Sequence, residues 1–267
     1  MKNLKLLFGI LISTFVLSCS SDDSGGGDNQ QLNTKLPKKI TSVAVSSEIP
    51  DPNPTIYSYE FSYNPDNTIR EIIHKQDVES DWTWKFYYEN GIPIQSKLLY
   101  GVETTIEYIY EAGRLVHEKY NNIYDSDYVN FGYFYTNGKL DYAGFVDSEV
   151  YFYYDFDSND NISQEEDSTG LTVFTYDNKK NPFINLHSNM KKIFVCNKIA
   201  EELGITYRGE LDLFLNTNKN NIIKINYNNN SISYEYVYEN EYDDEGYLLK
   251  STQLGNYNSI YTIEYYE

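Results

Sequence analysis

The feature that most constrains the fold is a repeat in which aromatic residues lie two positions apart and a polar turn follows. Each unit ends in a tyrosine and continues into a segment rich in Asn, Asp and Gly. The clearest closing tyrosines are Tyr63, Tyr88, Tyr110, Tyr135 and Tyr154, which gives a period of 19 to 25 residues. Residues two apart share one face of a β-strand, and Asn-Gly is typical of a tight hairpin turn. The repeat therefore predicts one β-hairpin per unit.

Successive hairpins that pair edge to edge form an antiparallel meander. We expect an all-β class for residues 37–267, as a single domain whose hairpins form a long twisted or curled sheet. Val150–Phe156 is apolar on both faces, which favours a strand that is covered on both sides or belongs to a strongly curled sheet. The 29 tyrosines fit this class because aromatic residues favour pleated, half-buried surfaces.

An insertion interrupts the repeat between about residues 182 and 231. Residues Ser188 to Leu203 have apolar side chains near one helical face, with Ser188 as a candidate cap and Gly204 as a stop. Two strands, Leu211–Leu215 and Ile222–Tyr227, are predicted to follow. We expect the single short helix, at 188–203, to lie on the sheet and cover apolar surface.

The N-terminus has the order of a secretory signal: basic Lys2 and Lys5, an apolar run from Leu6 to Leu17, then Ser18 and Cys19. The apolar run is too short for a spanning helix. With a cysteine at the cut site, the segment resembles a bacterial lipoprotein signal. The resemblance implies that residues 1–18 are cleaved and that Cys19 is acylated. Residues 19–36 are then expected to form a flexible acidic and Gly-rich tether.

The charge and the tether indicate where such a protein works. Ser20-Ser21-Asp22-Asp23 resembles the surface-export signal of Bacteroidetes-type lipoproteins, which implies a lipid anchor in the outer membrane and exposure at the cell surface. The net charge is −19, and loss of the two leader lysines takes it to about −21. A surface this acidic repels nucleic acid, so no nucleic-acid partner is expected. With Cys19 acylated, Cys196 has no partner for an intramolecular disulfide.

The turns also resemble those of a known family. The units Tyr242-Asp243-Asp244-Glu245-Gly246 and Tyr176-Asp177-Asn178-Lys179-Lys180-Asn181-Pro182-Phe183 are similar to the YD repeats of Rhs-type proteins. More closely, the chain resembles YD-repeat-like surface lipoproteins of Bacteroidetes, a family without a known activity, over most of Ile40–Glu267. The resemblance implies a repeat scaffold and no particular reaction.

One loop has the spacing of calcium ligands. Oxygen-bearing side chains recur with the EF-hand spacing at Asp155, Asp157, Asn159, Asn161 and Glu166. However, Asp160 stands where an EF-hand needs Gly, and the preceding segment is a predicted strand. The loop also falls where other repeats place their hairpin turn. An Asx-rich turn is therefore favoured over a weak calcium site, and no other cofactor is expected.

Trp82 and Trp84 lie two apart and share a strand face. They fit a stacking platform for a sugar ring or a peptide, but aromatic residues at strand spacing more often belong to a core. The three histidines, at positions 74, 117 and 187, are isolated and lack the short spacing of a metal site.

No catalytic motif is present, so we expect a non-enzymatic envelope lipoprotein. Its repeat sheet would be a scaffold or a binding module for a glycan, a peptide or another envelope protein. One alternative is a surface carbohydrate hydrolase, since such an enzyme needs only two suitably spaced carboxylates. A purely structural role in the envelope is the other.

Overall fold

The computed structural model describes residues 35–46, 54–76, 81–121, 128–146, 150–194, 212–215, 218–229, 231–255 and 257–266. The chain divides into two compact units, Met1–Asn33 and Thr34–Glu267, and every described residue belongs to the second. The predicted lipidation site Cys19 and the second cysteine, Cys196, lie outside the described residues.

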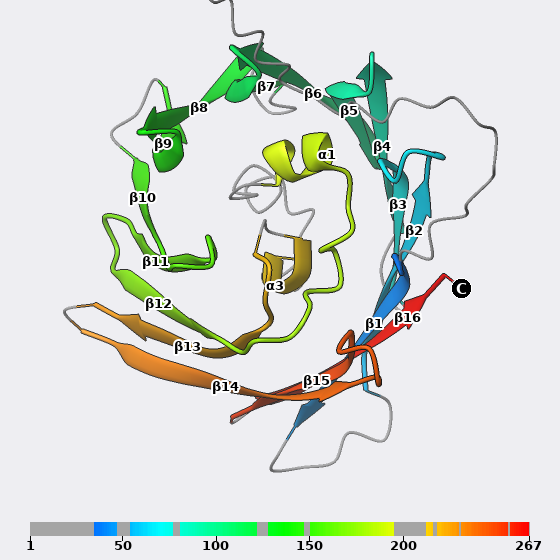
Figure 1. Cartoon of the computed structure of the whole chain (residues 1–267), viewed down its shortest axis with the longest axis vertical. Coiled ribbons are helices and arrows are strands. Elements are labelled where there is room, and N and C mark those ends of the chain that lie inside the picture. Colours follow the sequence, from blue (N-terminus) through cyan, green and yellow to red (C-terminus); the bar gives the residue numbers. More distant parts are fainter. Residues whose placement is uncertain are drawn as a thin grey trace, which may run out of the picture. The chain divides into compact units, whose positions relative to one another are not determined.

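The described strands form one closed antiparallel barrel, in which each strand pairs with its neighbours in sequence (Figure 1). Closure is made by β1 and β16, which pair from Pro37 with Tyr265 to Ser46 with Tyr257. The sixteen strands are β1 (Pro37–Ser46), β2 (Ile56–Tyr63), β3 (Ile69–Gln76), β4 (Trp82–Glu89), β5 (Ile92–Tyr100), β6 (Val102–Glu111), β7 (Arg114–Asn121), β8 (Tyr128–Thr136), β9 (Lys139–Phe145), β10 (Tyr151–Phe156), β11 (Ile162–Glu166), β12 (Leu171–Tyr176), β13 (Ile222–Asn228), β14 (Ser233–Tyr242), β15 (Leu248–Leu254) and β16 (Tyr257–Tyr265). The predicted meander is present, but the prediction of a long twisted or curled sheet is wrong because the meander closes on itself.

The bend that allows closure comes from β-bulges beside the turns. The strand register shifts near the end of several strands, just before the turn or the insertion that comes next. These shifts occur at Ser62/Tyr63, Tyr87/Tyr88, Ile109/Tyr110, Phe134/Tyr135, Asp155/Phe156, Thr175/Tyr176 and Glu241/Tyr242. A bulge bends its strand and increases the local twist, and repeated bulges curve a sheet toward closure. The same short repeat that forms the hairpins thus also bends them.

The closing tyrosines tie neighbouring hairpins together at this end of the barrel. Tyr176 donates a hydrogen bond from its hydroxyl to the carbonyl oxygen of Ile162, at 2.7 Å. The hydroxyl groups of Tyr63, Tyr88 and Tyr265 donate to the carbonyl oxygens of Pro37, Ile69 and Leu248 in the same way. A large aromatic ring therefore packs against the core while its hydroxyl group satisfies a backbone acceptor.

Strand alternation separates an apolar inner wall from a polar outer wall. On β4, Trp82, Trp84 and Phe86 are buried, whereas Lys85 and Tyr87 lie on the opposite face. Other buried side chains that continue the inner wall are Ile40, Tyr59, Phe61, Ile72, Leu98, Ile106, Tyr108, Phe131, Tyr133, Phe152, Tyr154, Tyr261 and Ile263. The hydrophobic core therefore lies inside the barrel.

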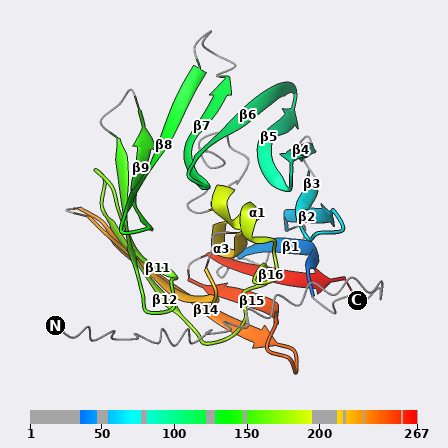
Figure 2. The ribbon, with the colours of Figure 1, turned by 45° about the horizontal axis from the view of Figure 1, so that its top comes forward.

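The insertion between β12 and β13 lies within the ring of strands (Figures 1 and 2). It contains α1 (Ser188–Ile193), which packs beside β5 and β7, and α3 (Asp212–Leu215). The ring of Phe183 lies 5.2 Å from that of Phe61, and the ring of Phe214 lies 5.5 Å from that of Tyr261. Wall side chains alone do not fill a barrel of sixteen strands. The insertion supplies the missing apolar volume.

Details of the predicted insertion need correction. The helix begins at Ser188 as expected, but its cap is His187, whose ring accepts a hydrogen bond from the backbone N–H of Asn189. Its described part ends at Ile193, and residues 195–203 lie outside the described residues. The predicted strand Leu211–Leu215 is wrong, since Asp212–Leu215 is helical, whereas β13 occupies the second predicted strand. Neither described helix is long and apolar enough to cross a membrane.

Candidate functional site

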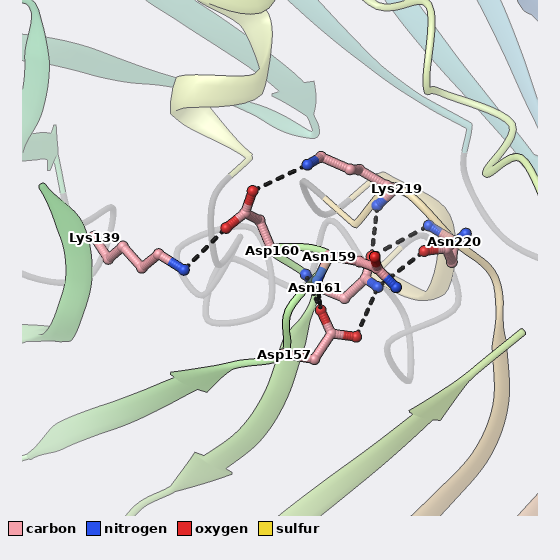
Figure 3. Close-up of polar contacts among 7 residues, drawn as sticks. All are labelled: Lys139, Asp157, Asn159, Asp160, Asn161, Lys219 and Asn220. Atoms are coloured by element: carbon pink, nitrogen blue, oxygen red, sulfur yellow. Dashed lines mark hydrogen bonds and ion pairs between the residues drawn. The ribbon is translucent and has the colours of Figure 1, made fainter. Parts of the chain in front are cut away.

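The predicted calcium loop is the tight turn between β10 and β11, and its oxygens bind the protein itself (Figure 3). Asp157 accepts hydrogen bonds from the backbone N–H groups of Asn159 and Asn161, at 2.7 and 3.0 Å, and from the Asn161 side chain at 2.9 Å. Burial acts to raise the pKa of Asp157, but these hydrogen bonds outweigh it and hold the pKa below its usual value. The carboxylate is thus the centre of an Asx-type turn.

The same turn joins the wall to the insertion. The Asn161 side-chain oxygen accepts from the backbone N–H groups of Lys219 and Asn220, at 2.7 and 3.2 Å (Figure 3). Asp160 forms ion pairs with Lys139 and Lys219, at 2.9 and 3.0 Å. Hydrogen bonds from these two lysines lower the pKa of Asp160 to about 2. Asp160 also has φ 64°, a left-handed conformation that favours Gly or Asn.

The remaining candidate ligands lie on the barrel wall. Asp155 pairs in register with Gln164, and Glu166 with Tyr153, on the face opposite the buried Phe152 and Tyr154. Among the described residues, no group of three or more His, Cys, Asp or Glu side chains could hold a metal ion. The calcium site stays a prediction, and substitution of Asp157 tests it directly.

Trp82 and Trp84 lie on the inner wall, where 5% and 3% of their surfaces are exposed. The Trp82 ring stacks on His74 at 4.9 Å, and Trp84 contacts Phe194 of the insertion edge to face at 5.8 Å. The two indoles share a face as the spacing predicts, and that face belongs to the core. Neither ring presents an exposed surface to a sugar or peptide.

His74 is a buried imidazole that no motif in the sequence singled out. Only 3% of its surface is exposed, and its two ring nitrogens have no hydrogen-bond partner within the described part of the chain. Burial lowers its pKa to about 4, against a smaller opposing effect of the Asp81 carboxylate. The ring is therefore neutral at pH 7 and acts as an aromatic packing element.

Glu118 is a buried acid on the inner wall of β7, with 4% of its surface exposed. It accepts a hydrogen bond from the Tyr133 hydroxyl at 2.9 Å. Burial raises the pKa of Glu118 to about 8, and the hydrogen bond from Tyr133 lowers it by less. No carboxylate of the described residues takes part in this shift. The sequence signal for Glu118 is weak: it lies two residues before Tyr120, at an inward position of an alternating strand.

The outer wall carries ion pairs between neighbouring strands. Each pair joins a lysine to a glutamate across one strand boundary, with nitrogen–oxygen distances of 2.6 to 3.9 Å. They are Lys39–Glu60, Lys75–Glu60, Lys85–Glu71, Lys97–Glu103, Lys224–Glu235 and Lys250–Glu241. Charged side chains therefore cover much of the outer wall from β1 to β6 and from β13 to β15.

Strands β8 to β10 differ, because aromatic side chains gather on their outer face. We name Phe134, Tyr142, Tyr151, Tyr153 and Val146 the outer aromatic patch. Tyr142 stacks on Phe134 at 4.4 Å, and its ring lies 5.7 and 5.6 Å from those of Tyr151 and Tyr153. Tyr153 and Val146 expose 51% and 43% of their surfaces.

Two glycines lie beneath the outer aromatic patch. Gly132 and Gly144 pair in register across β8 and β9. A Cβ atom on Gly144 would lie 2.6 Å from the Tyr151 ring and 2.4 Å from the carbonyl oxygen of Val150, and one on Gly132 would lie 3.1 Å from the Phe134 ring. The glycines thus let neighbouring rings and backbone lie close against the sheet. The apolar pattern of Val150–Phe156 was the sequence signal for this patch, although its outer side is exposed and not covered.

Comparison with solved structures relates the chain to porin-like barrels. One is a porin-like protein from Bacteroides uniformis, with a TM-score of 0.57, 14% identity, and coverage of 85% of this chain and 98% of that one. Another is a porin-like protein from Bacteroides vulgatus, with a TM-score of 0.40, 16% identity, and coverage of 87% and 99%. No family model and no curated protein matches the chain.

The first of these similarities shows the barrel fold, and at 14% identity it shows the fold alone. It corrects the resemblance to YD-repeat, Rhs-type proteins, which is wrong: the structural neighbour is a porin-like barrel, and the repeat is the hairpin unit of a closed wall.

Proposed function

We propose that this chain is a non-enzymatic binding module, anchored by a lipid on Cys19 to the outer membrane and exposed at the cell surface. In this proposal the barrel stands in water beside the membrane and does not form a pore. The observation that carries the proposal is the polarity of the barrel, whose inner wall is mainly apolar and whose outer wall carries ion pairs on β1 to β6 and on β13 to β15.

The outer wall supports a barrel surrounded by water. A membrane-spanning barrel presents an apolar band to lipid, and each Lys or Arg at the middle of that band costs about 2–4 kcal/mol. Here Lys85 and Glu71 on β4 and β3, and Lys250 and Glu241 on β15 and β14, form ion pairs on the outer wall. In water such pairs contribute little to stability, about 0–1 kcal/mol each, but they keep the wall soluble.

The interior supports a role other than conduction. A porin of this strand number has a polar lumen filled with water. In this chain Phe183, Met190 and Phe194 of the insertion are buried against the inner wall. The insertion is also hydrogen-bonded to the turns at one end, where His187 donates to the carbonyl oxygen of Asn67 and Asn189 to that of Gly91.

The interior gives the hydrolase alternative little support. A glycoside hydrolase needs two carboxylates about 5–10 Å apart, one of them with a raised pKa. Glu118 has the raised pKa, but its partner among the described residues is the Tyr133 hydroxyl. The outer aromatic patch, an exposed group of rings on a rigid wall, favours binding over a purely structural role.

The test is to release the barrel from the membrane without detergent. A site-specific protease sequence is inserted between Gly27 and Asp28 of the full chain, and washed outer membranes are treated with the protease. The proposal expects fatty-acid labelling of the intact chain and, after cleavage, a folded barrel in the supernatant. A barrel that stays with the membranes after cleavage would show that its wall is embedded in lipid.

The matched control is Cys19→Ala, which removes the acylated thiol and leaves the barrel unchanged. This variant should lose the fatty-acid label and leave the membrane fraction without protease. A label that persists in Cys19→Ala would contradict the anchor. Addition of the released barrel to a planar bilayer should produce no conductance steps, whereas stable steps would contradict the non-pore role.

A further inference from the structure

We propose that the outer aromatic patch binds a basic segment of a partner protein through stacked arginine side chains. The inference rests on the proposed function, since it names the site and the partner of the binding module. The patch is a rigid surface, because its rings project from three paired strands and pack on one another.

The rings provide the first half of the recognition. The guanidinium group of arginine is planar and stacks on tyrosine faces, where the ring attracts the positive charge. Tyr153 exposes about half of its surface, and Tyr142 packs between Phe134 on one side and Tyr151 and Tyr153 on the other. Clusters of tyrosine with an exposed ring are typical of the residues that dominate protein interfaces.

Charge complementarity provides the second half. Glu166 lies directly opposite Tyr153 on the neighbouring strand, and Asp155 follows Tyr153 by two residues on the same face. Asp141, next to Tyr142 in sequence, is exposed as well. Lys119 of β7 lies in register with Glu107 of β6 on one side and with Asn130 of β8 on the other. The surroundings of the rings are therefore net negative.

The sequence between the same strands, outside the described residues, is acidic as well. The segment 122–127, between β7 and β8, contains Asp125 and Asp127, and the segment 147–149, between β9 and β10, contains Asp147 and Glu149. Neither segment contains Lys, Arg or His. A second copy of this chain, with a net charge of −19, is disfavoured as the occupant because like charges repel.

The experiment measures fluorescence anisotropy of labelled hexa-arginine with the full mature chain in a neutral detergent. Hexa-lysine is the matched probe, because it has the same charge without a planar group that stacks. We expect hexa-arginine to bind about fivefold more tightly than hexa-lysine, and Tyr153→Ala to remove that preference. Glu166→Gln should weaken both peptides, since it removes charge and leaves the rings.

The control variant is Tyr87→Ala. Tyr87 is 41% exposed and lies on the outer wall of β4, a strand that is not part of the patch. It should keep the preference for arginine, and the circular dichroism and melting temperature of each variant confirm the fold. Equal affinity for the two peptides, or an arginine preference that survives Tyr153→Ala, would overturn the proposal. The proposal would also be overturned if the chain bound neutral maltoheptaose and not hexa-arginine, and Tyr153→Ala abolished the binding of the sugar.

Failure here is distinguishable from failure of the proposed function. If the patch shows no preference for hexa-arginine, the release of the barrel by protease is unaffected. A barrel that cannot be released from the membrane contradicts the proposed function whatever peptide it binds.

Discussion

The Tyr133 hydroxyl donates a 2.9 Å hydrogen bond to the buried carboxyl group of Glu118 inside the barrel. Burial raises the pKa of Glu118 to about 8, so the folded protein keeps the proton at pH 7. The unfolded chain releases it near pH 4.3. Glu118 therefore makes the free energy of unfolding depend on pH.

We expect Glu118→Gln to be more stable than the parent at neutral pH. As pH rises from about 4.3 to 8, the unfolded parent loses a proton that the folded parent retains, so its stability falls by up to about 1.4 kcal/mol per pH unit. Glutamine does not ionise and keeps an acceptor for Tyr133. Urea unfolding of both proteins from pH 5 to 9 measures the difference. Glu107→Gln, a change at an exposed residue of β6, should follow the parent.

His74→Phe should act at the acidic end of the profile. Burial lowers the pKa of His74 to about 4, so between pH 6.5 and 4 the unfolded chain binds a proton that the folded chain does not. Stability of the parent is therefore lost as pH falls through this window. Phenylalanine keeps the ring against Trp82 and removes the titration. Melting curves at pH 4.5, 5.5 and 7 should show a smaller acid loss in the variant.

The two groups offset one another where their windows overlap. Between about pH 4.3 and 6.5, Glu118 lowers stability with rising pH while His74 raises it, so the parent should show a shallow profile there. Each single variant should uncover the slope of the other group. Parallel profiles for the parent and both variants would mean that neither side chain is buried as described.

Tyr176→Phe tests the tyrosines that tie the hairpins together. The change removes the hydroxyl that donates to the Ile162 carbonyl oxygen at 2.7 Å and leaves that acceptor without this bond. We expect a loss of about 1–2 kcal/mol in the free energy of unfolding, measured with urea. Tyr153→Phe, which removes an exposed hydroxyl on the outer wall, is the control and should cost little. Equal stability of both variants would show that the bond contributes nothing.

Tyr63 and Tyr88 show how much of the fold the sequence predicts. Their alternating neighbours and the Asn-rich turns after them predict the hairpins, and β2 to β5 occur where the pattern places them. Closure depends on bulges at these same tyrosines and on the pairing of β1 with β16, which lie more than 200 residues apart. Local spacing does not encode a contact at that separation, so a curled sheet and a closed barrel have the same repeat.

The candidate site was harder to predict for a related reason. Spacing alone shows that Trp82 and Trp84 share a face and that Tyr151 and Tyr153 share another. Which face is buried depends on the direction in which the sheet curls as it closes, and on the insertion, whose Phe194 packs against Trp84. The single glutamate at an inward position of β7, Glu118, has no signal that separates it from exposed glutamates.

The turn at Asp157 decides between a structural joint and a cation site. Asp157→Ala removes the acceptor of three hydrogen bonds that hold Asn159 and Asn161, and Asn161 in turn holds the insertion at Lys219. We expect a loss of about 1–3 kcal/mol in the free energy of unfolding, equal in calcium and in chelator, because the lost partners are protein groups. Asp155→Ala, two residues away on the outer wall, is the control and should cost less. If millimolar calcium instead raises the melting temperature of the parent and of neither variant, the turn binds the cation. The hydrogen bonds of Asp157 would then describe the turn without calcium.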